Sequence, residues 1–214
     1  MKYKLIVFDL DGTLLDTLED LADSTNHALV SQGQPARSLE KVRCFVGNGI
    51  RKLIERAVPE GCSPEVTEAV FEEFKTYYGV HCNDRTRAYD GIMELLAALR
   101  QNHYRLAVVS NKADFAVQSL CQLYFKGMLD VAVGEKEGIR RKPAPDMVDE
   151  VLRIMNVDRS DAVYIGDSDV DIATARNAGM DCISVTWGFR SEDFLKEHGA
   201  EVLVDKPEEL LRFL

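Results

Sequence analysis

Short apolar runs alternate with helical patterns along most of the chain. The runs are too short for buried helices and are rich in Val and Ile, which is typical of strands buried on both faces. They cover residues 5–8, 106–109, 129–133, 162–165, 182–186 and 201–204. Strands that alternate with helices predict an α/β fold, with a Rossmann-like, mostly parallel sheet and helices on both of its faces.

Two helices show their apolar face clearly. Ile92, Leu95 and Leu99 recur at helical spacing, and so do Met147, Val151 and several residues between Met147 and Met155. The spacing of three and four residues places each set on one side of a helix.

One connection is much longer than a crossover between strands needs. The first strand ends near Leu10, and the second begins near Arg105. The extra stretch has helical periodicity, with Thr17 as a candidate N-cap and Ser63-Pro64 as a second helix start. We therefore predict an α/β core of residues 1–15 and 86–214, interrupted by a helical insert of residues 16–85.

Composition and charge fit an ordinary globular protein. The 214 residues are 46% hydrophobic and 29% charged, so a full core needs no disulfide or metal. The net charge of −10 (26 − 36) argues against nucleic acid and anionic membrane surfaces as partners. No apolar run approaches the roughly 20 residues of a membrane span.

The cysteine pattern indicates a reduced compartment. The chain has 5 cysteines, an odd number, and they are widely spaced without a C-x-x-C pair. The 4 histidines show no paired ligand spacing either. These observations favour a cytoplasmic protein without a zinc site.

Reactive side chains follow the strands or precede the next helix. They are Asp9, Asp11, Ser110, Lys142, Asp167 and Asp171. In open α/β sheets ligands bind at the carboxyl ends of the strands, where such residues converge. Asp is also a common turn residue, but turns alone explain poorly a set of acids, a hydroxyl and an amine. Clustered carboxylates require a cation, and oxygen ligands favour Mg²⁺ over Zn²⁺.

The motifs at these strand ends resemble those of the haloacid dehalogenase superfamily, in order and over the whole chain. They read Asp9-Leu10-Asp11-Gly12-Thr13, Ser110, Lys142 and Gly166-Asp167-Ser168-x-x-Asp171. The helical insert resembles the family's α-helical cap of the first type. Residues 46–49 and 185–190 are similar to the phosphoglycolate phosphatase-like subgroup, although Asp90 stands where a Pro is often seen.

The resemblance implies a set of catalytic roles. Asp9 is expected to attack phosphorus and form an aspartyl-phosphate, and Asp11 to protonate the leaving group and then activate water. Retention of Asp11 favours an oxygen leaving group over halide. Ser110 is expected to hydrogen-bond the phosphoryl group, and Lys142 to neutralise the nucleophile and phosphate oxygens.

The resemblance also implies the metal ligands. Mg²⁺ is expected to bind the Asp9 carboxylate, the Asp11 backbone carbonyl and Asp167, with Asp171 supporting the metal directly or through water. For Lys142 there is a simpler alternative, since it follows two arginines and a basic run is usually solvated.

Substrate contacts are expected from the core and from the insert. In the core these are Thr13 and Asn111, although Asn111 and Lys112 equally fit a helix cap and a solvent-facing residue. In the insert, Asn48 and Arg51 are the candidates, and Arg51 suits a substrate carboxylate. A plain turn between helices explains that segment about as well.

These expectations define a Mg²⁺-dependent phosphatase that hydrolyses a small phosphomonoester, such as phosphoglycolate, through an aspartyl-phosphate. The alternatives are a phosphomutase of the β-phosphoglucomutase kind and a pyrophosphatase. A non-catalytic phospho-accepting signalling module is remote, because such modules are shorter and lack the insert. The partner is expected to be a small phosphorylated metabolite, and the protein a monomer or homodimer.

Overall fold

The computed structural model describes residues 2–214 and separates into two compact units. One unit combines Met1–Leu15 with Ala88–Leu214, and the other is Asp16–Arg87. The division falls at the long connection that the sequence singles out. Within residues 2–214, no helix has the length and apolarity needed to cross a membrane.

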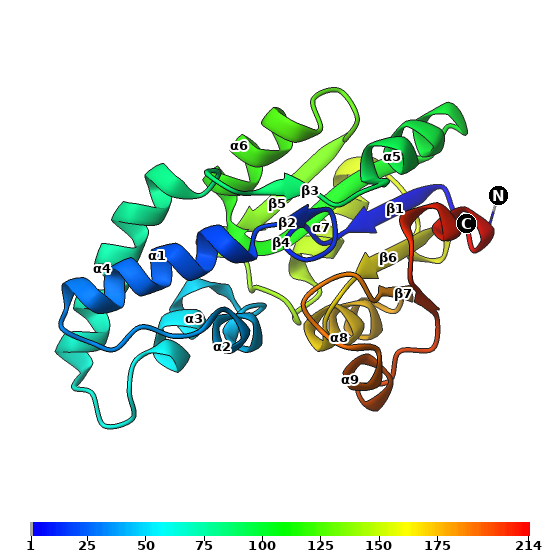
Figure 1. Ribbon diagram of the computed structural model, residues 1–214. Helices are drawn as coiled ribbons and strands as arrows, with labels where there is room; N and C mark the ends of the chain where they lie inside the picture. The colour runs from blue at the N-terminus through cyan, green and yellow to red at the C-terminus, as the bar shows by residue number, and fades with distance from the viewer. Residues whose placement is uncertain (1) are drawn as a thin grey trace. The chain divides into compact units, whose positions relative to one another are not determined.

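The first unit is built on a parallel sheet of six strands in the order β5-β4-β1-β6-β7-β8 (Figure 1). The strands are β1 (Leu5–Phe8), β4 (Arg105–Ala113), β5 (Val131–Glu135), β6 (Ala162–Gly166), β7 (Asp181–Val185) and β8 (Leu203–Val204). All six strands arise from the apolar runs of the sequence, so the predicted α/β class is confirmed. The central strand, β1, lies between β4 and β6, and its carboxyl end is therefore the middle of the sheet edge.

Helices cover both faces of this sheet, because β1 is apolar on both sides. Ile6 and Phe8 pack against one set of helices, and Leu5 and Val7 against the other. The first face carries α5 (Ile92–Gln101) and α6 (Asp114–Tyr124), and the second carries α7 (Asp146–Met155) and α8 (Asp169–Ala178).

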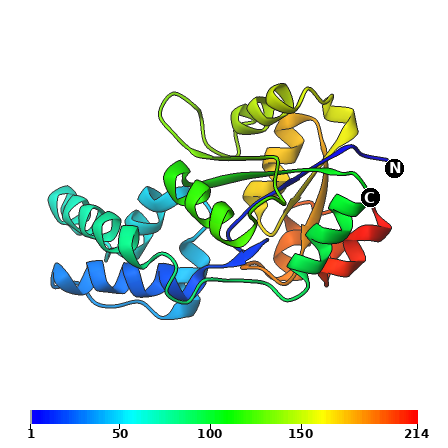
Figure 2. The same cartoon turned by 90° about the horizontal axis from the view of Figure 1, so that it is seen from above.

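The two ends of the chain lie side by side in this unit. The last element before the C-terminus is the short helix η2 (Pro207–Arg212), and the unit's other short helices are η1 (Arg159–Asp161) and α9 (Glu192–Glu197). Turned to the view of Figure 2, η2 lies beside α5 near the C-terminus. The backbone N–H of Lys2 donates to the carbonyl oxygen of Leu214 at 3.3 Å.

Strand β4 is longer than its sequence pattern predicts and contains a bulge. Val109 pairs with Val133 and Ala113 with Glu135, so four residues of β4 advance while β5 advances two. The extra residues bend the strand at the sheet edge where ligands bind. Gly134 makes room for this bend, since a Cβ there would lie 2.7 Å from the carbonyl oxygen of Lys112.

The second unit is helical. It contains α1 (Leu18–Ser31), α2 (Leu39–Phe45), α3 (Gly49–Ala57) and α4 (Pro64–His81). The hydroxyl of Ser63 accepts the N–H of Val66 at 3.4 Å and caps α4 as the sequence predicts, whereas Thr17 precedes α1 without a side-chain cap. Two short strands, β2 (Leu15–Asp16) and β3 (Arg87–Ala88), pair on either side of these helices, so the expectation of a wholly helical insert of residues 16–85 is wrong at Asp16.

Candidate active site

Asp9 is the first residue after the central strand β1. Its backbone N–H donates to the carbonyl oxygen of Ile165 at 2.9 Å, which continues the ladder with β6 and fixes the start of the loop. The side chain is buried, and its Oδ1 accepts the N–H of Leu10 at 2.7 Å and lies 2.9 Å from Nζ of Lys142. No residue in the described chain places a hydrogen-bond donor on the other oxygen, Oδ2.

Asp167 follows the neighbouring strand β6 and is enclosed by two glycines. A Cβ on Gly188 would overlap with Asp167, and a Cβ on Gly12 would lie 2.7 Å from its Cγ. The carboxylate accepts the N–H of Phe189 at 2.7 Å and the hydroxyl of Thr13 at 3.3 Å. The segment 187–189 therefore has a structural purpose, because it holds Asp167 against the loop after β1.

Asp171 lies in the first turn of α8, and both of its oxygens have partners. Oδ2 accepts the hydroxyl of Ser168 at 2.6 Å and its backbone N–H at 3.1 Å, while the Ser168 hydroxyl caps the helix in return. Oδ1 lies 2.8 Å from Nζ of Lys142 and 3.2 Å from the hydroxyl of Tyr164. Asp171 thus joins the start of α8 to the lysine.

Lys142 bridges two of these carboxylates from a buried position. Its Nζ contacts Asp9, Asp171 and, at 3.0 Å, the hydroxyl of Tyr164. Burial alone would lower the pKa of the Lys142 ammonium, but the carboxylates of Asp171 and Asp9 outweigh it and raise that pKa well above its usual value. The solvated-lysine interpretation is therefore wrong for Lys142, whose exposed fraction is 2%.

The bulge of β4 supplies three further buried side chains. The amide of Asn111 brackets the backbone of Lys142, accepting its N–H at 2.8 Å and donating to its carbonyl at 3.0 Å. The hydroxyl of Ser110 accepts the N–H of Lys112 at 3.2 Å, and Nζ of Lys112 lies 2.8 Å from Oδ1 of Asp11. The alternative of a solvent-facing Lys112 is wrong, since the residue is 5% exposed.

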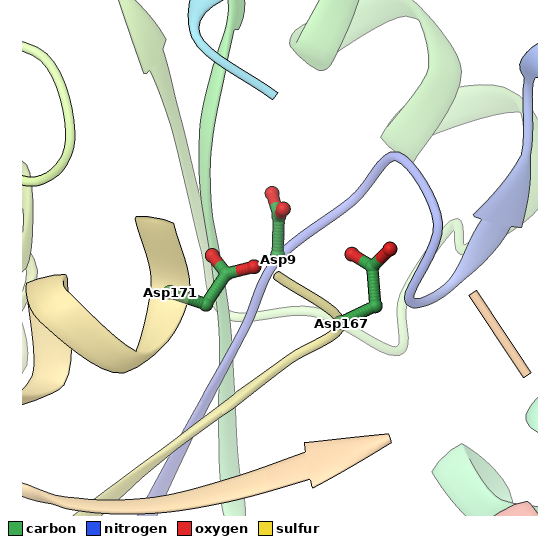
Figure 3. A group of neighbouring side chains, drawn as sticks. All are labelled: Asp9, Asp167 and Asp171. Atoms are coloured by element: carbon green, nitrogen blue, oxygen red, sulfur yellow. The ribbon is translucent and has the colours of Figure 1, made fainter. Parts of the chain in front are cut away.

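Three carboxylates form a group that could hold a metal ion. Ligand oxygens of Asp9, Asp167 and Asp171 all lie within 4.8 Å of one another, and the side chains stand together at the sheet edge (Figure 3). Burial, followed by the charge of Asp171, raises the pKa of Asp167 to about 7. The same two causes raise the pKa of Asp9 well above its usual value, with Lys142 opposing them.

The charges of the site are not balanced by its lysines. Four carboxylates, of Asp9, Asp11, Asp167 and Asp171, face the two ammonium groups of Lys112 and Lys142. When all are ionised, two negative charges remain, which a bound divalent cation would offset. The oxygen-only donor set fits a hard cation such as Mg²⁺.

The two predicted substrate residues of the insert lie in the helical unit. Asn48 precedes α3, and its side-chain oxygen accepts a hydrogen bond from Arg56 at 2.8 Å. Arg51 forms a bidentate ion pair with Glu68, at 2.6 and 3.1 Å, and its guanidinium covers the ring of Phe71 at 3.5 Å. The core residues are thus brought together within one unit, and these two belong to the other.

Comparison with known proteins decides the family. The model of the haloacid dehalogenase-like hydrolases matches residues 6–185 of the chain. The chain belongs to this family. A curated relative from Pseudomonas aeruginosa, N-acetylmuramic acid 6-phosphate phosphatase, is 36% identical over 100% of this chain and 96% of its own length. Another from that organism, phosphoglycolate phosphatase 1, is 30% identical over 97% of this chain and 78% of its own length.

Solved structures agree with this assignment to the haloacid dehalogenase-like hydrolases. A protein from Lactobacillus delbrueckii subsp. bulgaricus, provisionally assigned as a phosphoglycolate phosphatase, is 43% identical with a TM-score of 0.94. The similarity covers 98% of this chain and 97% of that one. The chain is therefore a phosphatase of the family, which confirms the resemblance and the enzyme class predicted from the motifs.

Sequence reasoning missed Lys112, Tyr164 and the role of segment 187–189. Lys112 follows Ser110 and Asn111 directly, but lysine is so commonly exposed that position alone does not indicate burial. Tyr164 is read only as a strand residue, although its hydroxyl contacts both Lys142 and Asp171. The sequence did contain a signal for segment 187–189, because a Trp-Gly-Phe run follows β7, the strand beside the one that leads to Asp167.

Proposed function

We propose that the chain is a Mg²⁺-dependent phosphatase that uses Asp9 as its nucleophile and acts on a small phosphomonoester bearing a carboxylate. The observation that carries this proposal is the buried Asp9, whose Oδ1 is held by Lys142 and Leu10 while Oδ2 receives no donor from the described residues. An oxygen that already accepts two hydrogen bonds is the weaker nucleophile. Oδ2 is therefore the oxygen proposed to attack phosphorus.

The reaction is proposed to run in two displacements. Oδ2 of Asp9 forms a bond to phosphorus, the ester P–O bond breaks, and Asp11 gives its proton to the departing oxygen. Asp11 then takes a proton from water, whose oxygen attacks phosphorus and returns Asp9 with release of phosphate. Lys142 neutralises the charge of Asp9 beside the phosphoryl group, and Ser110 donates a hydrogen bond to it.

The metal is proposed to bind the carboxylates of Asp9 and Asp167 with the backbone carbonyl of Asp11. When bound, Mg²⁺ supplies charge neutralisation for an anionic nucleophile and an anionic ester. Asp171 is the weaker candidate for a direct ligand, because both of its oxygens already have protein partners. Its proposed task is to hold Lys142 in place.

The substrate class is proposed from the names of the relatives. Two relatives are named for phosphoglycolate and for N-acetylmuramic acid 6-phosphate. Each of these compounds combines a phosphate ester with a carboxylate. Arg51 is the proposed partner of this carboxylate, since a guanidinium binds carboxylates with two parallel hydrogen bonds. Its present partner is Glu68, so a substrate would have to replace that residue.

Matched pairs of substrates test this proposal. Phosphate release is measured for phosphoglycolate against 2-hydroxyethyl phosphate, and for N-acetylmuramic acid 6-phosphate against N-acetylglucosamine 6-phosphate. Each pair differs in the group that bears the carboxylate. We expect kcat/KM to favour the acid in at least one pair, and Arg51→Gln to reduce that preference about 10- to 100-fold, the value of a charged hydrogen bond.

Arg85→Gln is the matched control for Arg51→Gln, because Arg85 is also an ion-paired arginine of the helical unit. Equal rates within both pairs would contradict the carboxylate assignment. Accumulation of an isomeric phosphate ester, without free phosphate, would instead identify a phosphomutase.

A further inference from the structure

The end of β4 directs three consecutive side chains into buried positions near the proposed reaction centre. In a regular strand, successive side chains point to opposite faces, so Ser110, Asn111 and Lys112 would not all serve one site. The bulge between Val109 and Ala113 breaks that alternation. Asn111 braces Lys142 and Ser110 accepts the N–H of Lys112, which leaves the Lys112 side chain to be explained.

The Lys112 side chain lies almost completely out of solvent and meets Asp11. Its side chain is 3% exposed, that of Asp11 is 15% exposed, and Nζ and Oδ1 are 2.8 Å apart. A buried ammonium that loses its partner carries a large desolvation cost, so the pair constrains both residues. The backbone of this loop is fixed where the N–H of Gly12 donates to the carbonyl oxygen of Leu15 at 2.8 Å, and the ion pair with Lys112 fixes the side chain of Asp11.

We propose that Lys112 is a positioning residue that holds the carboxylate of Asp11 where it exchanges a proton with the ester oxygen and with water. The inference rests on the proposed function, in which Asp11 is the acid and base. Proton transfer needs the carboxyl group within hydrogen-bond reach of the ester oxygen, and a loop side chain without a partner samples several rotamers.

Lys112 makes two contacts from the bulge of β4, one through its backbone and one through its side chain. The backbone N–H of Lys112 donates to Ser110, the proposed phosphoryl ligand, while its side chain holds Asp11. One residue therefore sets the spacing between a phosphate contact and the proton donor. Gly134 keeps it there, because the carbonyl oxygen of Lys112 occupies the space of a Cβ at that position.

Leaving-group dependence separates this role from a general effect on the fold. Breaking the P–O bond moves an electron pair onto the ester oxygen, which takes up the Asp11 proton. An alkoxide needs that proton, whereas p-nitrophenolate departs readily as the anion. The experiment measures kcat/KM of wild type and Lys112→Met for p-nitrophenyl phosphate and for the alkyl ester that wild type hydrolyses fastest.

We expect Lys112→Met to lower kcat/KM for the alkyl ester about 10- to 100-fold more than for p-nitrophenyl phosphate, a part of what general acid catalysis contributes. Both substrates are measured on one preparation, so a reduced folded fraction cancels in the ratio. Lys112→Gln gives the same comparison if the methionine variant does not fold. Lys136→Met, at an exposed ion pair with Glu150, is the control and should leave the ratio unchanged.

A double-mutant cycle tests whether Lys112 acts through Asp11. In an Asp11→Asn background, Lys112→Met should change the ratio no further, because the proton donor is already absent. Equal losses on both esters, or a further change of the ratio in the Asp11→Asn background, would overturn the proposal. A wild-type protein that hydrolyses neither ester would contradict the proposed function itself.

Discussion

Asp167 lies in a setting that suits a metal ligand, where the ionised carboxylate lowers the stability of the fold unless a cation offsets its charge. Its carboxylate is buried between Gly12 and Gly188, and its two hydrogen bonds do not supply a full positive charge. The pKa near 7 expresses that cost. The folded-state pKa of Asp167 lies above its unfolded value of 3.8, so this group favours folding fully at pH values below 3.8. This contribution is lost as the pH rises through about 7.

Mg²⁺ is therefore expected to stabilise the protein more at pH 8 than at pH 5.5. At pH 8 the cation meets an ionised Asp167 and relieves its burial, whereas at pH 5.5 it must compete with a proton. We expect the Tm gain from Mg²⁺ to be larger at pH 8 by at least about 5 °C, as measured by calorimetry. Asp167→Asn should remove the difference and Asp169→Asn, at a more exposed neighbour, should keep it. The same gain at both pH values would contradict a metal site at Asp167.

The positions of Asp9 and Asp167 at the sheet edge could be predicted from the sequence, because each directly follows a buried strand. It could not indicate which oxygens have partners. Asp171 is an example: the family resemblance implies that it supports the metal, yet its contacts with Ser168, Tyr164 and Lys142 depend on how α8 begins. Such contacts are set by tertiary packing and not by the local pattern.

At the scale of elements, the strands could be predicted and the irregularities could not. Runs of Val and Ile between helices determine the six strands, since few other elements bury so short a segment on both faces. The bulge in β4 depends instead on Gly134 of a neighbouring strand. Nothing within residues 105–113 alone signals it.

The segment 187–189 provides a test at this scale. A Cβ on Gly188 would overlap with the Gly12 carbonyl and with Asp167, so Gly188→Ala must displace the loop or the carboxylate. We expect about 1–3 kcal/mol of destabilisation from overpacking, and a raised Mg²⁺ requirement for activity. Urea unfolding and Mg²⁺ titrations of phosphate release measure the two effects.

Gly79 in α4 is the matched control for this substitution. A Cβ there meets nothing within 4 Å, so Gly79→Ala should be neutral or stabilise by about 0.5–1 kcal/mol. A Gly188→Ala variant as stable as the control, with an unchanged Mg²⁺ titration, would contradict the proposed support of Asp167.

At the scale of the whole molecule, the separation into two units follows from the length of one connection. The sequence predicted an insert of residues 16–85, and the structure separates Asp16–Arg87. The two differ only at the second boundary, where Arg87 begins β3, a strand too short to leave a pattern in the sequence. All proposed catalytic residues belong to one unit, and Asn48 and Arg51 to the other.

Removal of the helical unit should therefore affect selectivity more than chemistry. The backbone N–H of Tyr89 donates to the carbonyl oxygen of Leu14 at 3.2 Å, so a short Gly-Ser linker can replace residues 16–87. We expect the core to retain some hydrolysis of p-nitrophenyl phosphate and to lose its ranking of natural esters, because it recognises only phosphate. The same substrate panel, run on both proteins, measures this. An unchanged ranking in a folded core would place specificity outside the helical unit.

Trapping the phosphorylated enzyme tests the central claim most directly. The protein is mixed with a ³²P-labelled ester and Mg²⁺, quenched in acid within one turnover, and the labelled peptide is sequenced. We predict hydroxylamine-sensitive label on Asp9 in wild type and in the control Asp169→Asn, and no label in Asp9→Asn. The turnover of Asp9→Asn should fall about 10³-fold or more, while its Tm stays within a few degrees of wild type. Chelation of Mg²⁺ should abolish labelling. Label on another residue, or rapid turnover by Asp9→Asn, would contradict the assignment of Asp9 as the nucleophile.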